Sequence, residues 1–162
     1  MPRLLAAIWL VMTFMGISAK AQNPYQIPTL KGINTIFVDV EDLSESAKTL
    51  NLTKEAIQTD VELKLRLAGM RVVTLEQGVK LPGSPYLYIN VIVSENSKAA
   101  SISVDLVQDA ILVRDGQFAT GVTTWNTGAL ITNPADAQDI RNAIKDYVDK
   151  FLNDWLSVNP KK

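Results

Sequence analysis

Acidic side chains are the residues of this sequence whose types and spacing could support chemistry. Asp39 and Glu41 lie two residues apart at the end of an alternating apolar segment, so a strand there would place both carboxyl groups on one face. Paired carboxylates of this kind can act as acid and base in hydrolysis. No neighbouring residue in the sequence would separate the roles of the two groups or bind a metal. The pattern therefore favours solvated surface acids.

The composition excludes most other catalytic chemistry. The 162 residues contain no histidine and no cysteine. Ser-His-Asp and Cys-His catalysis, zinc sites built on thiolate or imidazole, and disulfide bonds are therefore excluded. We expect no cofactor and no metal. The sequence favours a protein without enzymatic activity and leaves carboxylate chemistry open.

The first 21 residues have the organisation of a cleavable secretory signal peptide. Arg3 precedes an uncharged apolar run over residues 4–17, and Ala19 and Ala21 supply small residues at alternating positions before a cut. The run is shorter than the roughly 20 apolar residues that a membrane-spanning helix needs. We predict cleavage after Ala21, an unlipidated N-terminus at Gln22, no membrane span after cleavage, and export to the periplasm or the cell exterior.

The charge balance argues against nucleic acid as a partner. Removing Arg3 and Lys20 from the 16 basic residues leaves 14 against 17 acidic ones, a net charge of −3. Nucleic-acid-binding proteins usually concentrate positive charge on one face, and anionic membranes also attract positive charge. We therefore expect this chain to bind neither nucleic acid nor anionic membranes.

Two helices are predicted from capping residues and apolar spacing. Thr53 is a favourable N-cap for a first helix that Gly69 ends. Asn133 is the expected N-cap of a second, longer helix that Pro160 ends. Apolar residues recur at intervals of three and four along both segments, which predicts that each helix packs one face against a core.

Five strands are predicted from apolar alternation and turn signals. One strand, over residues 33–40, precedes the first helix. A polar connection over 41–51, with room for one helical turn, joins them. Residues 77–85 contain two glycines and two prolines and are expected to form a loop. The other four strands are expected over residues 71–75, 86–94, 99–114 and 117–127.

This order, β-α-β-β-β-β-α, predicts the α+β class. We expect a single, mostly antiparallel sheet of about five strands with two helices packed on one face. The chain divides into a signal peptide (residues 1–21), an extended leader (22–31) and a single α+β domain (32–162). The opposite face of the sheet would be open.

The last two strands form a hairpin that is apolar on both faces near its end. Asp115 and Gly116 suit a two-residue type I′ turn. This register pairs Leu106 with Trp125 on the face toward the helices. The residues of the second apolar face are Val107, Ile111, Val113, Phe118 and Val122, with Val113 opposite Phe118.

Three interpretations of this second apolar face are open. A β-bulge near residues 106–108 would shift the alternation, so that only one face is apolar. The face could instead meet a partner protein or a second copy of the chain, because contiguous exposed apolar surface usually marks an interaction site. The leader (22–31) could also cover it.

Two tyrosines extend the candidate binding surface. Tyr86 and Tyr88 share one face of a neighbouring strand, and Trp125 is on another strand. Aromatic side chains arranged in this way can stack on sugars or peptides, or can pack within a sheet. We include both tyrosines in the candidate surface.

The order of elements behind a signal peptide resembles small α+β domains of the bacterial cell envelope. The residues that carry the resemblance are 61–69, at the end of the first helix, and 149–152, in the last one. The similar families are the lipopolysaccharide-assembly lipoproteins and the N-terminal domain of the Tol-Pal translocation protein. The resemblance implies an envelope location and no particular functional residue.

These patterns favour an exported, non-catalytic binding or assembly accessory of the cell envelope. Its partner would be a protein or another envelope component, bound through the open sheet face or the hairpin end. A carboxylate-dependent hydrolase using Asp39 and Glu41 is one alternative. A structural homo-oligomer is the other.

Overall fold

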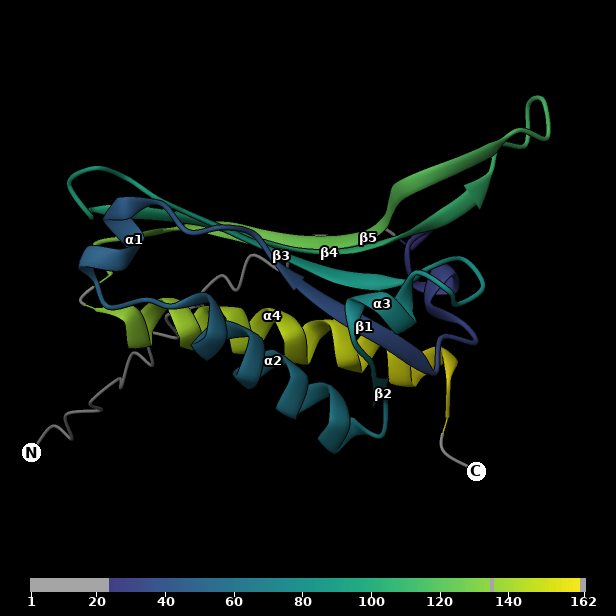
Figure 1. The fold of residues 1–162 in the computed structure, drawn as a ribbon, viewed down its shortest axis with the longest axis horizontal. Helices are drawn as coiled ribbons and strands as arrows, with labels where there is room; N and C mark the ends of the chain where they lie inside the picture. Colours follow the sequence, from purple (N-terminus) through teal and green to yellow (C-terminus); the bar gives the residue numbers. More distant parts are fainter. Residues whose placement is uncertain (1–23, 135, 161–162) are drawn as a thin grey trace, which may run out of the picture.

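A five-stranded sheet with the strand order β2-β1-β3-β4-β5 carries two long helices on one face (Figure 1). The computed structural model describes residues 24–134 and 136–160. It confirms the predicted α+β class and the predicted order of the strands and long helices. It adds two short helices, one between the first strand and the first long helix and one between the second and third strands.

The sheet is mixed rather than mostly antiparallel. Its strands are β1 (Thr35–Val40), β2 (Arg71–Val72), β3 (Tyr86–Val93), β4 (Ala99–Ile111) and β5 (Phe118–Thr132). Both neighbours of β1, namely β2 and β3, run parallel to it, because helix-containing connections return the chain to the same end of the sheet. Only β3, β4 and β5 form an antiparallel meander.

The first long helix, α2 (Lys54–Ala68), has the predicted ends. The Thr53 side chain accepts a hydrogen bond from the backbone N–H of Ala56, as an N-cap does. Gly69 follows the helix with φ of 100°, a left-handed conformation that residues with a Cβ disfavour. Local capping chemistry therefore determines both ends of α2.

The N-cap of the second long helix, α4 (Ala137–Val158), lies three residues later than predicted. The actual N-cap is Asp136, whose carboxylate accepts from the backbone N–H groups of Gln138 and Asp139. Asn133 instead has φ of 50°, and its N–H donates to the Lys98 carbonyl. The prediction was wrong because β5 continues to Thr132, five residues past its expected end.

Two short helices lie in segments where the sequence predicted a polar connection with room for one helical turn and the junction of a strand with a loop. The first, α1 (Glu45–Thr49), begins after Ser44, whose side chain caps it. The second, α3 (Leu75–Gly78), has a capping box formed by Thr74 and Gln77. It replaces the end of the predicted 71–75 strand, which stops at Val72, and the start of the predicted 77–85 loop. These turns are too short for periodicity to reveal them, although their caps are visible in the sequence.

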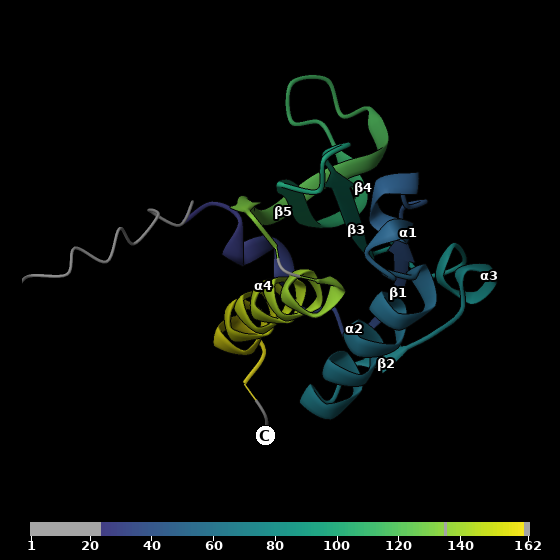
Figure 2. The same ribbon diagram turned by 90° about the vertical axis from the view of Figure 1, so that its left-hand side faces the viewer.

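The core lies between the sheet and the two long helices. Alternate strand residues, α2 and α4 supply buried apolar side chains, so the face of the sheet toward the helices is covered. Figure 2 shows α2 and α4 on one side of the sheet and the end of the β4–β5 hairpin on the other. Buried members of the core include Ile36, Val38, Ile57, Val61, Leu87, Ile89, Val104, Leu106, Ile144 and Val148.

The described part of the predicted leader is folded rather than extended. It contains a 3₁₀ turn, η1 (Ile27–Leu30), and Leu30 is completely buried. Asn159, just past α4, ties this turn down: its Nδ2 donates to the Leu30 carbonyl and its Oδ1 accepts from Gly32 N–H. The predicted signal peptide and its cleavage site after Ala21 lie outside the described residues. Among the helices that are described, none is long and apolar enough to cross a membrane.

Candidate functional site

The β4–β5 hairpin ends in a wider loop than the predicted two-residue turn. The last paired residues are Ile111 and Phe118, and six residues, 112–117, connect them. Leu112 N–H donates to the Gln117 carbonyl over 2.8 Å, and Gly116, with φ of 70°, donates to the Leu112 carbonyl over 2.7 Å. The predicted opposition of Val113 and Phe118 is therefore wrong.

The register changes because β5 contains extra residues. The predicted pair Leu106–Trp125 is present, but the pairing shifts between Leu106 and Val107 and again between Gln108 and Ala110. The first shift is the predicted β-bulge, which is confirmed. Because bulges bend a strand and increase its twist, the distal part of the hairpin leaves the plane of the sheet (Figure 1).

The predicted apolar face divides into buried and exposed parts at the bulges. Val107 is 6% exposed, and Val122 is partly buried. Beyond them the side chains of Ile111, Val113 and Phe118 are 70%, 101% and 67% exposed. We call these three residues the hairpin-end cluster. The bulges thus remove part of the candidate surface and leave the rest exposed.

The leader contacts the hairpin at the bulges and not at its end. The Thr29 hydroxyl donates to the Thr124 carbonyl over 3.3 Å. Gln108 Nε2 donates to the Thr29 carbonyl over 3.3 Å and to the Thr124 hydroxyl over 2.8 Å. These contacts fix the base of the bent segment, and the described residues of the leader do not cover the hairpin-end cluster.

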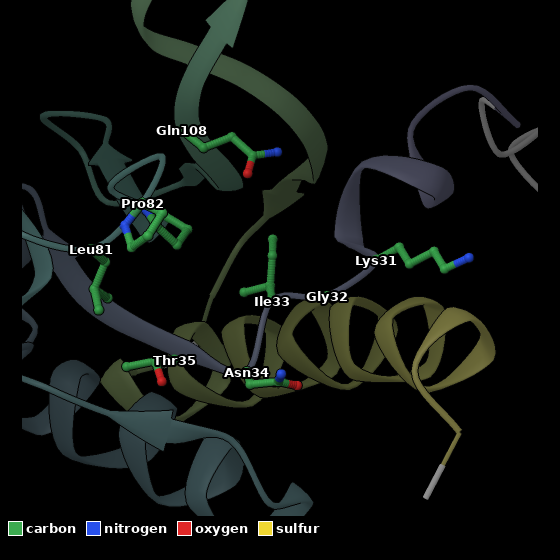
Figure 3. A pocket seen from close by; sticks show the side chains of 9 residues that line it. Lys31, Gly32, Ile33, Asn34, Thr35, Leu81, Pro82 and Gln108 are labelled. Atoms are coloured by element: carbon green, nitrogen blue, oxygen red, sulfur yellow. The ribbon is translucent and has the colours of Figure 1, made fainter.

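The base of the bent segment also borders an open cavity of about 420 Å³ (Figure 3). Its lining residues are Lys31, Gly32, Ile33, Asn34, Thr35, Leu81, Pro82, Pro85 and Gln108. No carboxylate lines this cavity, and the Lys31 side chain points away from it (Figure 3). No charged side chain therefore points into this cavity.

The two candidate tyrosines lie on the open face of the sheet, next to acidic residues. Tyr88 is paired with Asp39 on β1 and with Asp105 on β4, and its hydroxyl donates to the Glu41 carboxylate. This hydrogen bond raises the pKa of Tyr88 to about 12, so the phenol stays protonated. Tyr86, the next residue on this face, stacks on Phe37 with ring centroids 4.8 Å apart.

Parallel pairing of β1 with β3 creates this combination of tyrosines and acids. Local sequence patterns reveal each strand but not which strands pair, so the juxtaposition was not predicted. Trp125, in contrast, points to the helix-covered face, where it is 1% exposed. It therefore does not join the tyrosines.

Burial perturbs two further groups on the open face. The pKa of Asp105 is raised because the carboxyl group is partly buried, an effect that a hydrogen bond from Ser103 partly offsets. Burial also raises the pKa of Tyr86, with smaller contributions from the negative charges of Asp39 and Asp109. The open face thus combines acidic and aromatic character, without a group of acids arranged to hold a metal among the residues that are described.

The two candidate catalytic carboxylates have different surroundings. Asp39 contributes to one of about 390 Å³, where it is accompanied by Glu62 and Arg66 of α2. Glu41 is exposed, does not line that cavity and accepts the hydrogen bond from Tyr88. Acid–base catalysis needs both groups within reach of one substrate, and the cavity that Asp39 lines does not include Glu41.

No protein-family model matches the chain, and no curated protein matches it in sequence. Solved structures that match it include two with low similarity. A PelC dodecamer from Paraburkholderia phytofirmans is 12% identical, with a TM-score of 0.44, and the match covers 77% of this chain and 89% of that one. A minor lipoprotein from Acinetobacter baumannii is 8% identical, with a TM-score of 0.41, and the match covers 80% and 95% of the two chains. Neither likeness is close enough to transfer a function to this chain.

Proposed function

We propose that this chain is an exported, non-catalytic binding module of the cell envelope, which docks a partner protein through its hairpin-end cluster. One observation carries the proposal: the β4–β5 hairpin bends out of the sheet and presents Ile111, Val113 and Phe118 with 67% or more of each side chain exposed. A small chain gains nothing in stability from such a surface. Binding would remove these apolar side chains from water.

The chemistry of the hairpin end favours a protein partner over an anionic membrane. The loop contains one cation and one anion, Arg114 and Asp115, which contact each other at 3.2 Å. The hairpin end therefore has no excess positive charge to attract phospholipid head groups. A protein groove with apolar walls would accommodate the opposed side chains of Ile111 and Phe118.

Export is the second part of the proposal and rests on the sequence pattern of residues 1–21. Expression of the full chain followed by cell fractionation and intact-mass measurement tests it. We expect an exported protein whose mass corresponds to a start at Gln22. A cytoplasmic protein that retains residues 1–21 would contradict this part of the proposal.

Site-specific crosslinking tests the docking surface. Because the chain contains no cysteine, Val113→Cys introduces a unique attachment point for a bifunctional crosslinker in the native envelope. We expect one discrete adduct with a different protein, identified by mass spectrometry, which disappears when Ile111→Lys and Phe118→Lys are added. Leu67→Cys is the matched control, because Leu67 is 74% exposed on α2, away from the hairpin.

The same experiment can contradict the proposal in two ways. Equal adducts from Val113→Cys and Leu67→Cys would show that the hairpin end is not a selective docking surface. An adduct with the mass of two copies of the chain would show that the cluster contacts another copy rather than a different protein.

A further inference from the structure

We infer that the C-terminal half of β5 forms an antiparallel pair with the same strand of a second copy of this chain. The inference concerns a different surface from the hairpin-end cluster and does not depend on the proposed function. It rests on three features of β5: the composition of its exposed edge, a position where the fold permits only glycine, and an exposed leucine beside that glycine.

The two edges of the sheet differ in how they are protected from pairing. One edge is β2, which has only two residues, one of them Arg71. The other is β5, which has 15 residues with the sequence FATGVTTWNTGALIT and contains no charged residue and no proline. Proteins usually protect long edges with charges, prolines, bulges or a covering segment, because unpaired backbone groups attract other strands.

Among the described residues, such protection covers part of the β5 edge and leaves the rest without it. Its first half contains the bulges, and η1 contacts it at Thr124 through the Thr29 hydroxyl. Residues 126–132 pair regularly with β4, from Asp105↔Asn126 to Ala99↔Thr132. We call these seven residues the regular edge segment. A regularly paired edge without charge is the kind that accepts another strand.

The side chains of the regular edge segment suit a second copy. Leu130 lies on the open face of the sheet and is 65% exposed. Gly128 lies two residues earlier on the same face. A Cβ at Gly128 would lie 2.2 Å from the Ile102 carbonyl oxygen, so the fold requires glycine there. This leaves room on the open face directly beside an exposed leucine.

A two-fold axis through Ala129 uses both features at once. In an antiparallel pair centred there, Leu130 of each copy lies opposite Gly128 of the other. Thr127 lies opposite Ile131, and Asn126 opposite Thr132, so no like charges meet across the axis. Lys150 reaches this segment from α4, where its Nζ donates to the Thr127 hydroxyl over 3.3 Å. That contact is on the helix-covered face, so it does not block the strand edge or the open face.

Cysteine crosslinking tests both the pairing and its register. Residues directly opposite in an antiparallel pair have Cα atoms about 4.5–5.5 Å apart, within the range that a disulfide bridges. Ala129→Cys should therefore form a disulfide-linked dimer under mild oxidation in protein purified from expression of the full chain. Ile92→Cys is the control, because Ile92 is 58% exposed on the open face but belongs to the interior strand β3, which has no free edge.

Light scattering and sedimentation test the pairing without a crosslink. We expect a concentration-dependent dimer that is lost in Leu130→Lys and retained in both Ile92→Lys and Phe118→Lys. The retained dimer in Phe118→Lys separates this interface from the hairpin-end cluster. The inference is overturned if the unmodified protein stays monomeric at all concentrations and Ala129→Cys forms no disulfide dimer. Equal dimer in Leu130→Lys, or equal crosslinking through Ile92→Cys, would place any dimer contact elsewhere.

Discussion

The indole N–H of Trp125 donates a hydrogen bond to the Asp154 carboxylate over 2.8 Å, and both side chains are buried. This contact joins the edge strand β5 to α4. The Trp125 ring also meets Phe151 of α4 edge-on, with ring centroids 5.2 Å apart. Along β5, Trp125 directly follows the bulged residues, so the contact anchors the point where the bent hairpin joins the regular part of this strand.

Trp125→Phe should lower the free energy of unfolding by about 2 kcal/mol, because the buried Asp154 carboxylate loses the indole N–H as a donor and the ring loses contact area. Urea denaturation followed by circular dichroism measures the change. Asp154→Asn is the matched variant, since an amide oxygen can still accept from the indole N–H. It should cost less than Trp125→Phe. A larger cost for Asp154→Asn would show that other contacts of Asp154 matter more than this hydrogen bond.

Gly78→Ala should also destabilise the fold, by about 1–3 kcal/mol. A Cβ at Gly78 would lie 2.0 Å from Cδ1 of Phe37, which is 3% exposed and stacked on Tyr86. The ring would have to move, and α3 would separate from β1. Thermal unfolding measures the effect, and Lys80→Ala, at an exposed position just past α3, is the control. Equal stability of Gly78→Ala and the unmodified protein would show that α3 does not pack tightly on this face.

The elements that local chemistry determines were predictable from the sequence. Thr53 and Gly69 give α2 its ends, and alternating apolar residues identify β3 and the start of β4. The bulge near Leu106 was predictable in kind, because two apolar faces on one strand conflict with one covered face. The effect of the bulge on the hairpin turn was not predictable, since each extra residue in β5 shifts every pair between the bulge and the turn.

The candidate surface was only partly predictable for a related reason. Alternation along the strands places three apolar residues, Ile111, Val113 and Phe118, on the face that the helices were not expected to cover. The structure leaves them exposed. The proximity of Tyr88 to Glu41 depends on β1 pairing with β3 across about fifty residues of intervening chain. No local pattern encodes such a pairing, so the acids and the tyrosines were considered separately.

Asp60→Asn should destabilise the contact between α2 and α4 by about 1 kcal/mol at neutral pH, since the groups are partly solvated. Asp60 Oδ2 lies 2.7 Å from Arg141 Nε and 3.2 Å from Lys145 Nζ. The hydrogen bond from Arg141, with help from Lys145, lowers the pKa of Asp60 below its ordinary value of 3.8.

The pH dependence of this effect has a definite sign. Because the pKa of Asp60 is lower in the folded state, its stabilisation is complete above the ordinary value and disappears as the pH falls through the lowered one. Denaturation curves of the unmodified protein and Asp60→Asn should therefore differ at neutral pH and converge in strong acid. A difference that persists undiminished in strong acid would show that packing, not charge, stabilises the contact.

Asp105→Asn should have the opposite effect and stabilise the protein by roughly 0.5 kcal/mol at neutral pH, a small value because the group is only partly buried. Burial raises the pKa of Asp105 above its ordinary value of 3.8, which means that the folded state disfavours the charged carboxylate. The stability of the unmodified protein should accordingly rise, through this group, as the pH falls through the raised pKa, and the advantage of the amide should shrink over the same interval.

Asp146→Asn on α4 is the control for Asp105→Asn, because it removes the same charge from an exposed position. If both variants are stabilised equally, the gain comes from lower net negative charge and not from the open face. If Asp105→Asn alone is stabilised, the charged carboxylate of Asp105 lowers the stability of the unmodified protein. This carboxylate lies between Tyr88 and Asn126 on the neighbouring strands. A residue kept at such a cost, on a face that also holds Glu41 and two tyrosines, would make this face the next surface to examine by crosslinking after the hairpin end.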